Sequence, residues 1–442
     1  MTAWASAILG GRLAARICKG LMIGDPAIRM ARLAATRRLI LATSSLLMAA
    51  ILPASVASSK AVQLRNVDGG PSYYSQFSNP LPSDPSYFPI GIWFESVVSQ
   101  ADVNLDKDAG LNLYVVLTAS SNLSLVQRNG MRAILQESEW RTNQAAINSP
   151  AVAGWGLSDE TDMQQGPDRG YNTLNTTLAK LPNDGRLRYN NYGKGVMFWE
   201  TDPQASRFVN DFQHVVSNDI YWFTDPHVSG SSEGGKLLND GRPLTPTQTR
   251  RAANYGYTVD RMRALDTRRK PIWNFVEVGW PFTETEAQGA RAIQPAEITA
   301  AVWHSIIAGA QGIIYFNHSF GGPNKTQHCL RDPAYAGVRA AVKSTNQLVA
   351  QLAPVLNAPF ADGFVSANPF VRTMAKFHDN RYYVFAGSRE NRGSTPTLSL
   401  SGVDSGTATV IGENRTILIS NGQFSDSFAD GNAIHIYRID SQ

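Results

Sequence analysis

The chain has very little cysteine. It contains two cysteines in 442 residues, Cys18 and Cys329, and we expect Cys18 to be removed with an N-terminal leader. Cys329 alone would then remain, which excludes an intramolecular disulfide and a cysteine-based zinc cluster. The seven histidines are scattered and form no His-x-x-x-His pattern. The sequence therefore predicts no metal site, and we expect no cofactor.

The body of the chain also lacks an excess of basic charge. Seven of the 40 Lys and Arg residues and one of the 36 Asp and Glu residues lie within residues 1–57, which leaves 33 basic and 35 acidic residues in the remainder. Such a body has no basic field that would attract phosphates. We therefore expect no nucleic-acid partner.

Residues 1–57 have the composition of an export signal. A pair of arginines, Arg37 and Arg38, precedes the apolar run at 39–52, and small residues follow it. We predict cleavage near Ala57 and a secreted or cell-envelope protein. Because the run is short and interrupted by Ser and Thr, we expect no membrane span, although an uncleaved signal anchor is the alternative.

Two motifs of other enzyme classes are incomplete. Residues 230–237, GSSEGGKL, have the glycine and lysine spacing of a P-loop, but Leu237 stands where a Ser or Thr must hold magnesium. A nucleotide cofactor is therefore not expected. We also expect no Gly-x-Ser-x-Gly elbow and no zinc-binding helix, so a lipase-like or peptidase-like hydrolase is the last of the alternatives.

Apolar runs alternate with helical patterns after a Ser-, Pro- and Gly-rich lead-in at residues 58–87. The eight runs are 88–94, 111–117, 131–135, 151–157, 195–199, 218–223, 271–276 and 312–316. Helix candidates include 245–264, 295–308 and, after the final run, 334–352. Eight such units predict an α/β protein with a (β/α)₈ TIM barrel at residues 88–357.

The pattern changes in residues 358–442. Short alternating stretches separated by Gly and Asn turns replace the helical periodicity, as in a small C-terminal β-sandwich domain. Apart from Trp4, every tryptophan lies between Trp93 and Trp303. We therefore expect this domain to support packing rather than to bind sugar.

Two predicted strands end in carboxylates. Residues 151–162, AVAGWGLSDETD, lead into Asp159 and Glu160, and residues 271–280, PIWNFVEVGW, deliver Glu277. The C-terminal ends of barrel strands carry the catalytic groups of barrel enzymes. Two carboxyl groups at such ends are the pair that glycoside hydrolysis requires.

Several further segments carry a family resemblance. They are the Gly-Trp-x-x-x-Asp-Glu turn that ends at Glu160, KPIW at 270–273, QPAE at 294–297, GAQGIIYF at 309–316, FSDSF at 424–428 and IHIY at 434–437. On these residues the chain resembles the retaining glycoside hydrolases of the (β/α)₈-barrel clan, which hold an acid/base Glu after strand four and a nucleophile Glu after strand seven. The resemblance covers residues 88–440 and implies that Glu160 is the acid/base and Glu277 the nucleophile.

The chain departs from this clan at one position. The clan usually has Asn before the acid/base Glu, where it contacts the sugar 2-hydroxyl, and this chain has Asp159. An Asp still accepts a hydrogen bond from a hydroxyl. Its charge would also keep Glu160 protonated, which suits a general acid.

Other polar and aromatic residues near predicted strand ends are candidates for contact with substrate. Glu200 is the substitute nucleophile, and Trp280 is the preferred platform for a sugar ring. Each of these residues has a plainer alternative as core or as solvated surface. The full set of predicted substrate contacts is Asp159, Trp93, Glu200, Tyr221, Trp280, Tyr315 and Asn317.

The sequence thus predicts a secreted glycoside hydrolase that cleaves a polysaccharide or glycoconjugate by a retaining double displacement. Its partner would be a carbohydrate substrate, and the oligomeric state is not predicted. The alternative is a non-catalytic carbohydrate-binding barrel, against which the intact strand-end carboxylates Glu160 and Glu277 argue.

Overall fold

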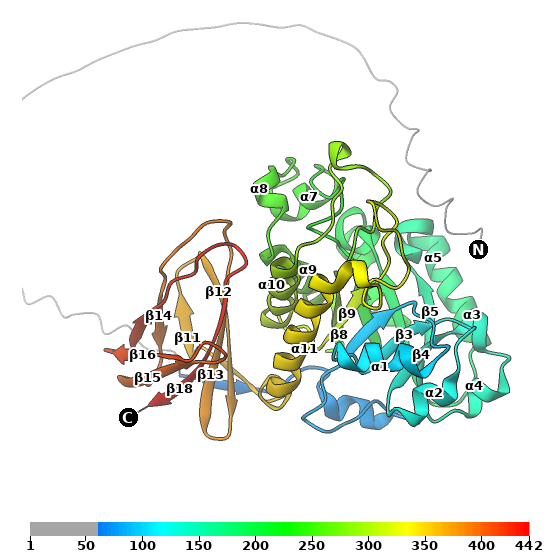
Figure 1. Cartoon of the computed structure of the whole chain (residues 1–442), viewed down its shortest axis with the longest axis horizontal. Coiled ribbons are helices and arrows are strands. Elements are labelled where there is room, and N and C mark those ends of the chain that lie inside the picture. Colours follow the sequence, from blue (N-terminus) through cyan, green and yellow to red (C-terminus); the bar gives the residue numbers. More distant parts are fainter. Residues whose placement is uncertain (1–60, 442) are drawn as a thin grey trace, which may run out of the picture. The chain divides into compact units, whose positions relative to one another are not determined.

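Residues 61–441 are described by a computed structural model, so the predicted export signal lies outside the described residues. Eight parallel strands close into a barrel, which confirms the predicted fold (Figure 1). In barrel order the strands are β2 (Ile90–Trp93), β3 (Leu113–Leu117), β4 (Arg132–Gln136), β5 (Val152–Asp159), β6 (Leu187–Tyr192), β7 (Val215–Asn218), β8 (Ile272–Glu277) and β9 (Gly312–Phe316).

The fifth and sixth strands of the barrel lie at other residues than predicted. Residues 195–199 form a π-helical turn, and the fifth strand of the barrel is β6, LRYNNY. The sixth strand, β7, ends at Asn218, where the predicted strand began. Both strands carry buried Asn or Ser side chains near their C-terminal ends, which makes them look less apolar than the segments that follow them.

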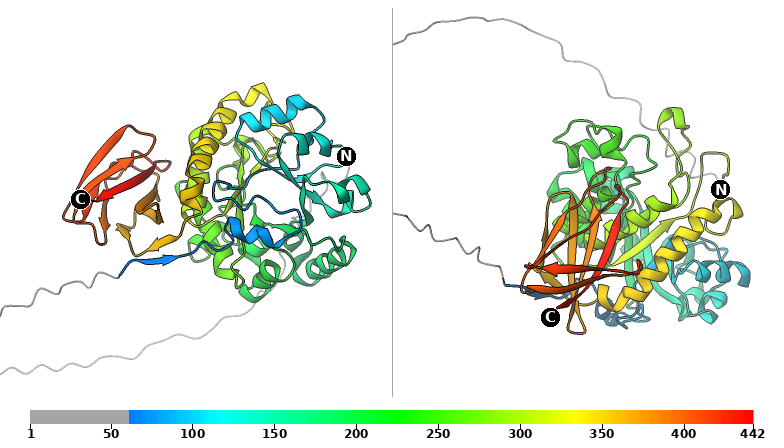
Figure 2. Two further views of the ribbon diagram at one scale, coloured as in Figure 1. Left: turned by 90° about the horizontal axis from the view of Figure 1, so that it is seen from below. Right: turned by 60° about the vertical axis from the view of Figure 1, so that its left-hand side comes forward.

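Helices surround the barrel, as the view along its axis shows (Figure 2). The predicted helix at 245–264 is divided into α8 and α9, whereas α10 and α11 lie close to the predicted bounds. Helix α10 begins with Pro295 and a capping box between Gln294 and Glu297, two common helix-start signals.

None of the described helices has the length and apolar character of a membrane span. The α-helices are α1 (Gln100–Asp108), α2 (Leu123–Arg128), α3 (Glu137–Trp140), α4 (Gln144–Asn148), α5 (Thr161–Lys180), α6 (Asp202–Asp211), α7 (Gly234–Leu238), α8 (Pro246–Thr249), α9 (Ala253–Leu265), α10 (Pro295–Ile307) and α11 (Ala336–Leu356).

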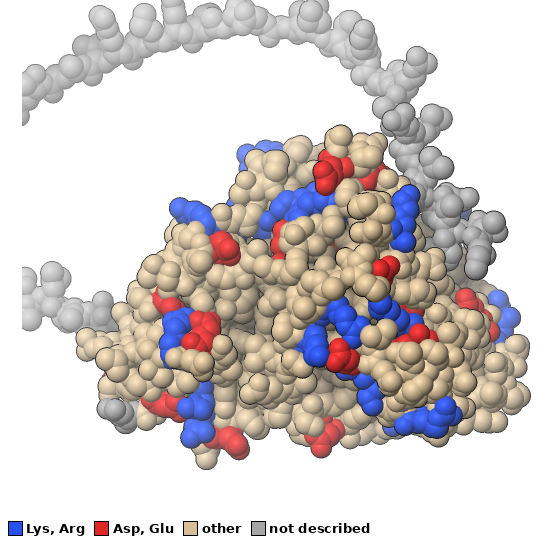
Figure 3. Space-filling view, viewed as in Figure 1, with Lys and Arg blue, Asp and Glu red and all other residues tan. Residues whose placement is uncertain are grey.

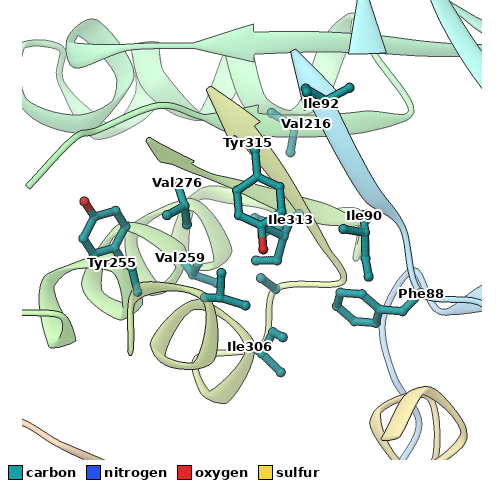
Figure 4. Close-up of a cluster of buried hydrophobic side chains, with 14 of the residues drawn as sticks. Phe88, Ile90, Ile92, Val216, Tyr255, Val259, Val276, Ile306, Ile313 and Tyr315 are labelled. Atoms are coloured by element: carbon teal, nitrogen blue, oxygen red, sulfur yellow. The ribbon is translucent and has the colours of Figure 1, made fainter. Parts of the chain in front are cut away.

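The barrel has one apolar layer inside and another between its strands and helices. Trp93, Trp273 and Phe275 are among the residues that fill the interior, and Tyr74 from the lead-in segment accepts a hydrogen bond from the Trp273 indole (3.2 Å). Figure 4 shows part of the outer layer, where strand residues such as Tyr315 meet helix residues such as Ile306. The interior of the barrel is therefore packed with apolar side chains.

The C-terminal region forms an antiparallel sheet of ten strands with its own hydrophobic core, as expected of a β-sandwich. One strand, β1 (Gln63–Arg65), comes from the lead-in segment and pairs with β10, which the sequence did not predict. The others are β10 (Phe360–Asp362), β11 (Val365–Ala367), β12 (Val371–His378), β13 (Arg381–Ser388), β14 (Thr397–Leu400), β15 (Ser405–Val410), β16 (Arg415–Ser420), β17 (Gln423–Ser425) and β18 (Ile434–Ser441).

This sheet packs against α9 and α10 of the barrel. The rings of Trp303 and Phe385 stack with centroids 5.9 Å apart, and Arg372 donates two hydrogen bonds to Asp260, at 2.9 and 2.6 Å. On the visible face of the molecule, basic and acidic side chains lie near one another (Figure 3).

We predict that Gly387→Ala destabilises the contact between the sheet and the barrel. A Cβ at Gly387 would lie 2.7 Å from the ring of the fully buried His304 and 2.8 Å from Ile434. Such overpacking should lower the free energy of unfolding by about 1–3 kcal/mol, measured by urea denaturation. The matched control is Gly337→Ala in α11, where the nearest atom lies 3.9 Å away. Equal stability of the two variants would contradict this account of the interface.

Candidate active site

Glu160 follows β5 in an unusual backbone conformation. Its φ and ψ are 47° and 35°, the left-handed region that a non-glycine residue rarely occupies. Its N–H donates to the Asn191 carbonyl (3.2 Å), and its own carbonyl accepts from the Gln164 N–H in the first turn of α5 (2.9 Å). A Cβ at Gly193 would lie 3.0 Å from Glu160 Oε1, so this glycine leaves room for the carboxyl group.

Asp159 is held by a chain of polar side chains from β6 and β7. Its Oδ1 accepts from the Asn191 amide (3.0 Å), and Asn191 Oδ1 accepts from the Ser217 hydroxyl (2.8 Å). Ser217 in turn lies 2.6 Å from the Tyr189 hydroxyl. Asn191 and Ser217, which made β6 and β7 difficult to recognise as strands in the sequence, therefore position Asp159.

Asp219 is a site residue that the sequence analysis missed. It directly follows β7, and its carboxyl group lies within hydrogen-bonding reach of Glu160. The Tyr221 hydroxyl lies 3.5 Å from Asp219 Oδ2. The available signal was the short run VVSN before Asp219, which places a carboxylate at the C-terminal end of the sixth strand.

Three carboxyl groups near the end of β5 and β7, those of Glu160, Asp219 and Asp159, have raised pKa values. Burial, followed by the charges of Asp159 and Asp162, raises the pKa of Glu160 to about 8. Burial, followed by the charge of Glu160, raises the pKa of Asp219 well above its ordinary value. Burial also raises the pKa of Asp159 to about 6. Neighbouring carboxyl groups cannot all ionise cheaply in such surroundings, which favours retention of a proton within this group of three.

Glu277 occupies a separate environment at the end of β8 and is fully buried. Its Oε1 accepts from the Thr224 hydroxyl (3.0 Å), and its Oε2 accepts from the Tyr255 hydroxyl (2.6 Å). Burial raises the pKa of Glu277 to about 7, and the hydrogen bonds from Tyr255 and Thr224 oppose the rise. Each oxygen has a donor, which fixes the orientation of the carboxylate.

Tyr221 connects the two environments. After burial, the charges of Asp219, Glu160, Asp159 and Glu277 all raise the pKa of Tyr221. Tyr221 lies in the loop after β7, not in a strand as predicted. The structure therefore brings Glu160, Glu277, Asp159 and Tyr221 to one end of the barrel.

Aromatic rings border this end of the barrel. Tyr221 contacts Phe316 and Phe282, with centroids 5.1 and 6.2 Å apart, and both phenylalanines are partly exposed. Trp280, the predicted platform, is only 8% exposed, because the turn at 321–322 packs directly on its indole. Phe282 and Phe316 are therefore the more accessible rings at this end of the barrel.

The remaining predicted contacts lie elsewhere. Trp93 packs inside the barrel against Phe275 and is buried. Tyr315 points outward into the core, where its hydroxyl donates to Asn346 of α11 (2.7 Å), so its predicted contact with substrate was wrong.

Asn317 is fully engaged in a loop. Its amide donates to Glu95 (2.5 Å), and its oxygen accepts from the Leu330 N–H (2.9 Å). Glu200 ends the π-helical turn rather than a strand and is buried, so the reason for considering it a substitute nucleophile was wrong.

A Gly-x-Ser-x-Gly spacing does occur, at residues 230–234, contrary to our expectation. Ser232 is exposed in a turn before α7, and the preceding strand β7 ends at Asn218. An elbow requires the serine directly after a strand, so this segment has the spacing without the structure.

We predict that Tyr255→Phe raises the pKa of Glu277 above about 7. The variant loses a donor that stabilises the charged carboxylate, a change worth about one pH unit. The measurement is a ¹³C NMR titration of glutamate carboxyl carbons, with Glu277 assigned from Glu277→Gln. Tyr315→Phe removes a buried hydroxyl that donates to Asn346 and not to this carboxylate, so it should leave the titration unchanged. An unchanged or lower pKa in Tyr255→Phe would refute the assigned hydrogen bond.

The fold is similar to that of solved glycoside hydrolases. One structure described as a glycoside hydrolase aligns with 86% of this chain and 97% of its own, at 12% identity and a TM-score of 0.52. A glycoside hydrolase family 5 structure from Bacteroides vulgatus aligns with 83% of this chain and 90% of its own, at 12% identity and a TM-score of 0.50. No family model and no curated protein matches the chain. At this identity the likeness establishes a shared barrel fold.

Proposed function

We propose that this protein is a glycoside hydrolase that acts on a polysaccharide or glycoconjugate with net retention. The proposal rests on one observation. Glu160 and Glu277 are two carboxyl groups in different surroundings, and the charges of both raise the pKa of the Tyr221 hydroxyl. Two carboxyl groups held in different environments can take the separate roles of acid and nucleophile. The fold shared with glycoside hydrolases supports the same reaction class.

The roles follow from the local contacts. Glu277, oriented by Tyr255 and Thr224, attacks the anomeric carbon while protonated Glu160 gives its proton to the departing glycosidic oxygen. The result is a glycosyl ester on Glu277 and a free alcohol. Glu160, now a carboxylate, then removes a proton from water, whose oxygen attacks the same carbon and releases Glu277.

We further propose that residues 1–57 direct export, because they combine two arginines, an apolar run and small residues near Ala57. N-terminal sequencing of the secreted protein would test this. A screen of polysaccharides and aryl glycosides, with Glu160→Gln and Glu277→Gln as controls, identifies the substrate.

We predict that Glu277→Ala abolishes hydrolysis of every substrate, with a loss on the order of 10³-fold or more. Azide can enter the space that the carboxylate vacated and attack the anomeric carbon. Activity should then return in part, with a glycosyl azide of inverted configuration as the product, identified by NMR. Azide rescue with inversion in the Glu160 variant instead would reverse the two roles.

Glu160→Ala should depend on the leaving group. An acidic phenol departs without protonation, so the first step should be nearly normal for activated aryl glycosides and strongly slowed for unactivated sugars. The comparison is kcat/KM across aryl glycosides whose phenols differ in pKa. An equal loss for all leaving groups would remove Glu160 from the role of general acid.

A further inference from the structure

Lys194 is a largely buried cation that the proposed reaction does not use. It lies in the loop after β6, and 17% of its side chain is exposed. Its Nζ lies 2.8 Å from Asp225 Oδ2 and 2.7 Å from Glu233 Oε2, both in the loop after β7. Asp225 is buried. Burying an ion pair often yields little net stability, so the geometry that the pair fixes is the better explanation for it.

Each end of this ion pair is linked to one of the two carboxyl groups of the site. On the lysine side, the preceding residue Gly193 packs against Glu160, because a Cβ at Gly193 would lie 3.0 Å from Glu160 Oε1. On the other side, Asp225 follows Thr224, whose hydroxyl donates to Glu277 Oε1 (3.0 Å). The ion pair thus joins the loop beside the proposed acid to the loop that orients the proposed nucleophile.

We propose that Lys194 is a positioning residue that ties these two loops together and thereby holds Glu160 and Glu277 at a fixed separation. The inference rests on the proposed function. A double displacement needs the acid and the nucleophile at a defined distance on either side of one glycosidic bond, and a displacement of about 1 Å can cost about 100-fold in rate. Lys194 is suited to positioning rather than to contact with substrate, because two carboxylates already engage its ammonium group.

The segment at 230–237 gains a role in this arrangement. It has the glycine and lysine spacing of a P-loop without the hydroxyl that would hold magnesium, and its Glu233 directly precedes α7. The backbone folds tightly here, since a Cβ at Gly234 would collide with the Val228 carbonyl oxygen. This close approach fixes Glu233 where its carboxylate meets Lys194.

Lys194→Met tests the proposal, because methionine has a similar length but cannot form the ion pairs. We expect kcat for an unactivated substrate to fall about 10- to 100-fold, whereas KM should change little because a positioning residue makes no contact with substrate. The matched control is Lys343→Met, which breaks a more exposed ion pair between α11 and Asp108 of α1 (2.7 Å) and should leave both constants unchanged. A wild-type kcat in Lys194→Met would overturn the proposal.

A double-mutant cycle tests whether the ion pair itself is responsible. Asp225→Asn breaks the same pair from the other loop, so its loss of kcat should resemble that of Lys194→Met. The double variant should lose little more than the worse single variant, since two residues of one pair do not act independently. Losses that multiply would contradict the tie. If Lys194→Met does not fold because Asp225 is left unpaired, the triple variant with Asp225→Asn and Glu233→Gln added leaves no unpaired charge and replaces it in the kinetic comparison.

Hydrogen exchange measured by mass spectrometry needs no substrate. Residues 193–200 and 219–233 should exchange faster in Lys194→Met than in the wild type, and both segments should match the wild type in Lys343→Met. Unchanged exchange in both segments of Lys194→Met would overturn the proposal. Faster exchange in a protein without glycosidase activity would support the tie between the loops and reject the proposed function.

Discussion

The carboxyl groups of Asp159, Glu160, Asp219 and Glu277 accept no hydrogen bond from a Lys or Arg of the described residues. This lack of cationic partners is the constraint on which the site depends. Ionising Glu277 or Glu160 in partly or fully buried surroundings is costly unless neutral donors or shared protons compensate. Thr224 and Tyr255 supply the donors for Glu277. Asn191 supplies one for Asp159, and burial together with the charges of Asp159 and Asp162 favours the protonated form of Glu160.

This constraint explains where the sequence predicted the fold correctly and where it did not. Strands such as β8 and β9 are mostly apolar and were placed within about one residue of their bounds. In contrast, β6 and β7 must place Asn191 and Ser217 inside the barrel to hold Asp159. Their polar residues weaken the apolar signal, so more hydrophobic segments downstream were mistaken for strands.

The candidate site was partly predictable for the same reason. Glu160 and Glu277 directly follow or end apolar strands, so their positions could be inferred from the chain alone. Asp219 was missed because β7 was predicted in the wrong place. Tyr255 comes from α9, and only the tertiary fold brings its hydroxyl to Glu277. Tyr315 and Phe316 show how strand alternation decides a role, since Tyr315 joins the outer core while its neighbour contacts Tyr221.

The most direct test of the assigned reaction is covalent trapping of the nucleophile. Activated 2-deoxy-2-fluoro glycosides form a long-lived glycosyl ester in retaining enzymes, because the fluorine slows both steps and the good leaving group speeds only the first. Mass spectrometry of the digested protein should find the sugar on the peptide that contains Glu277. A label on another carboxylate, such as Glu200, would contradict the assignment. Turnover of an unmodified aryl glycoside with a first-formed product of inverted configuration would contradict the retaining mechanism itself.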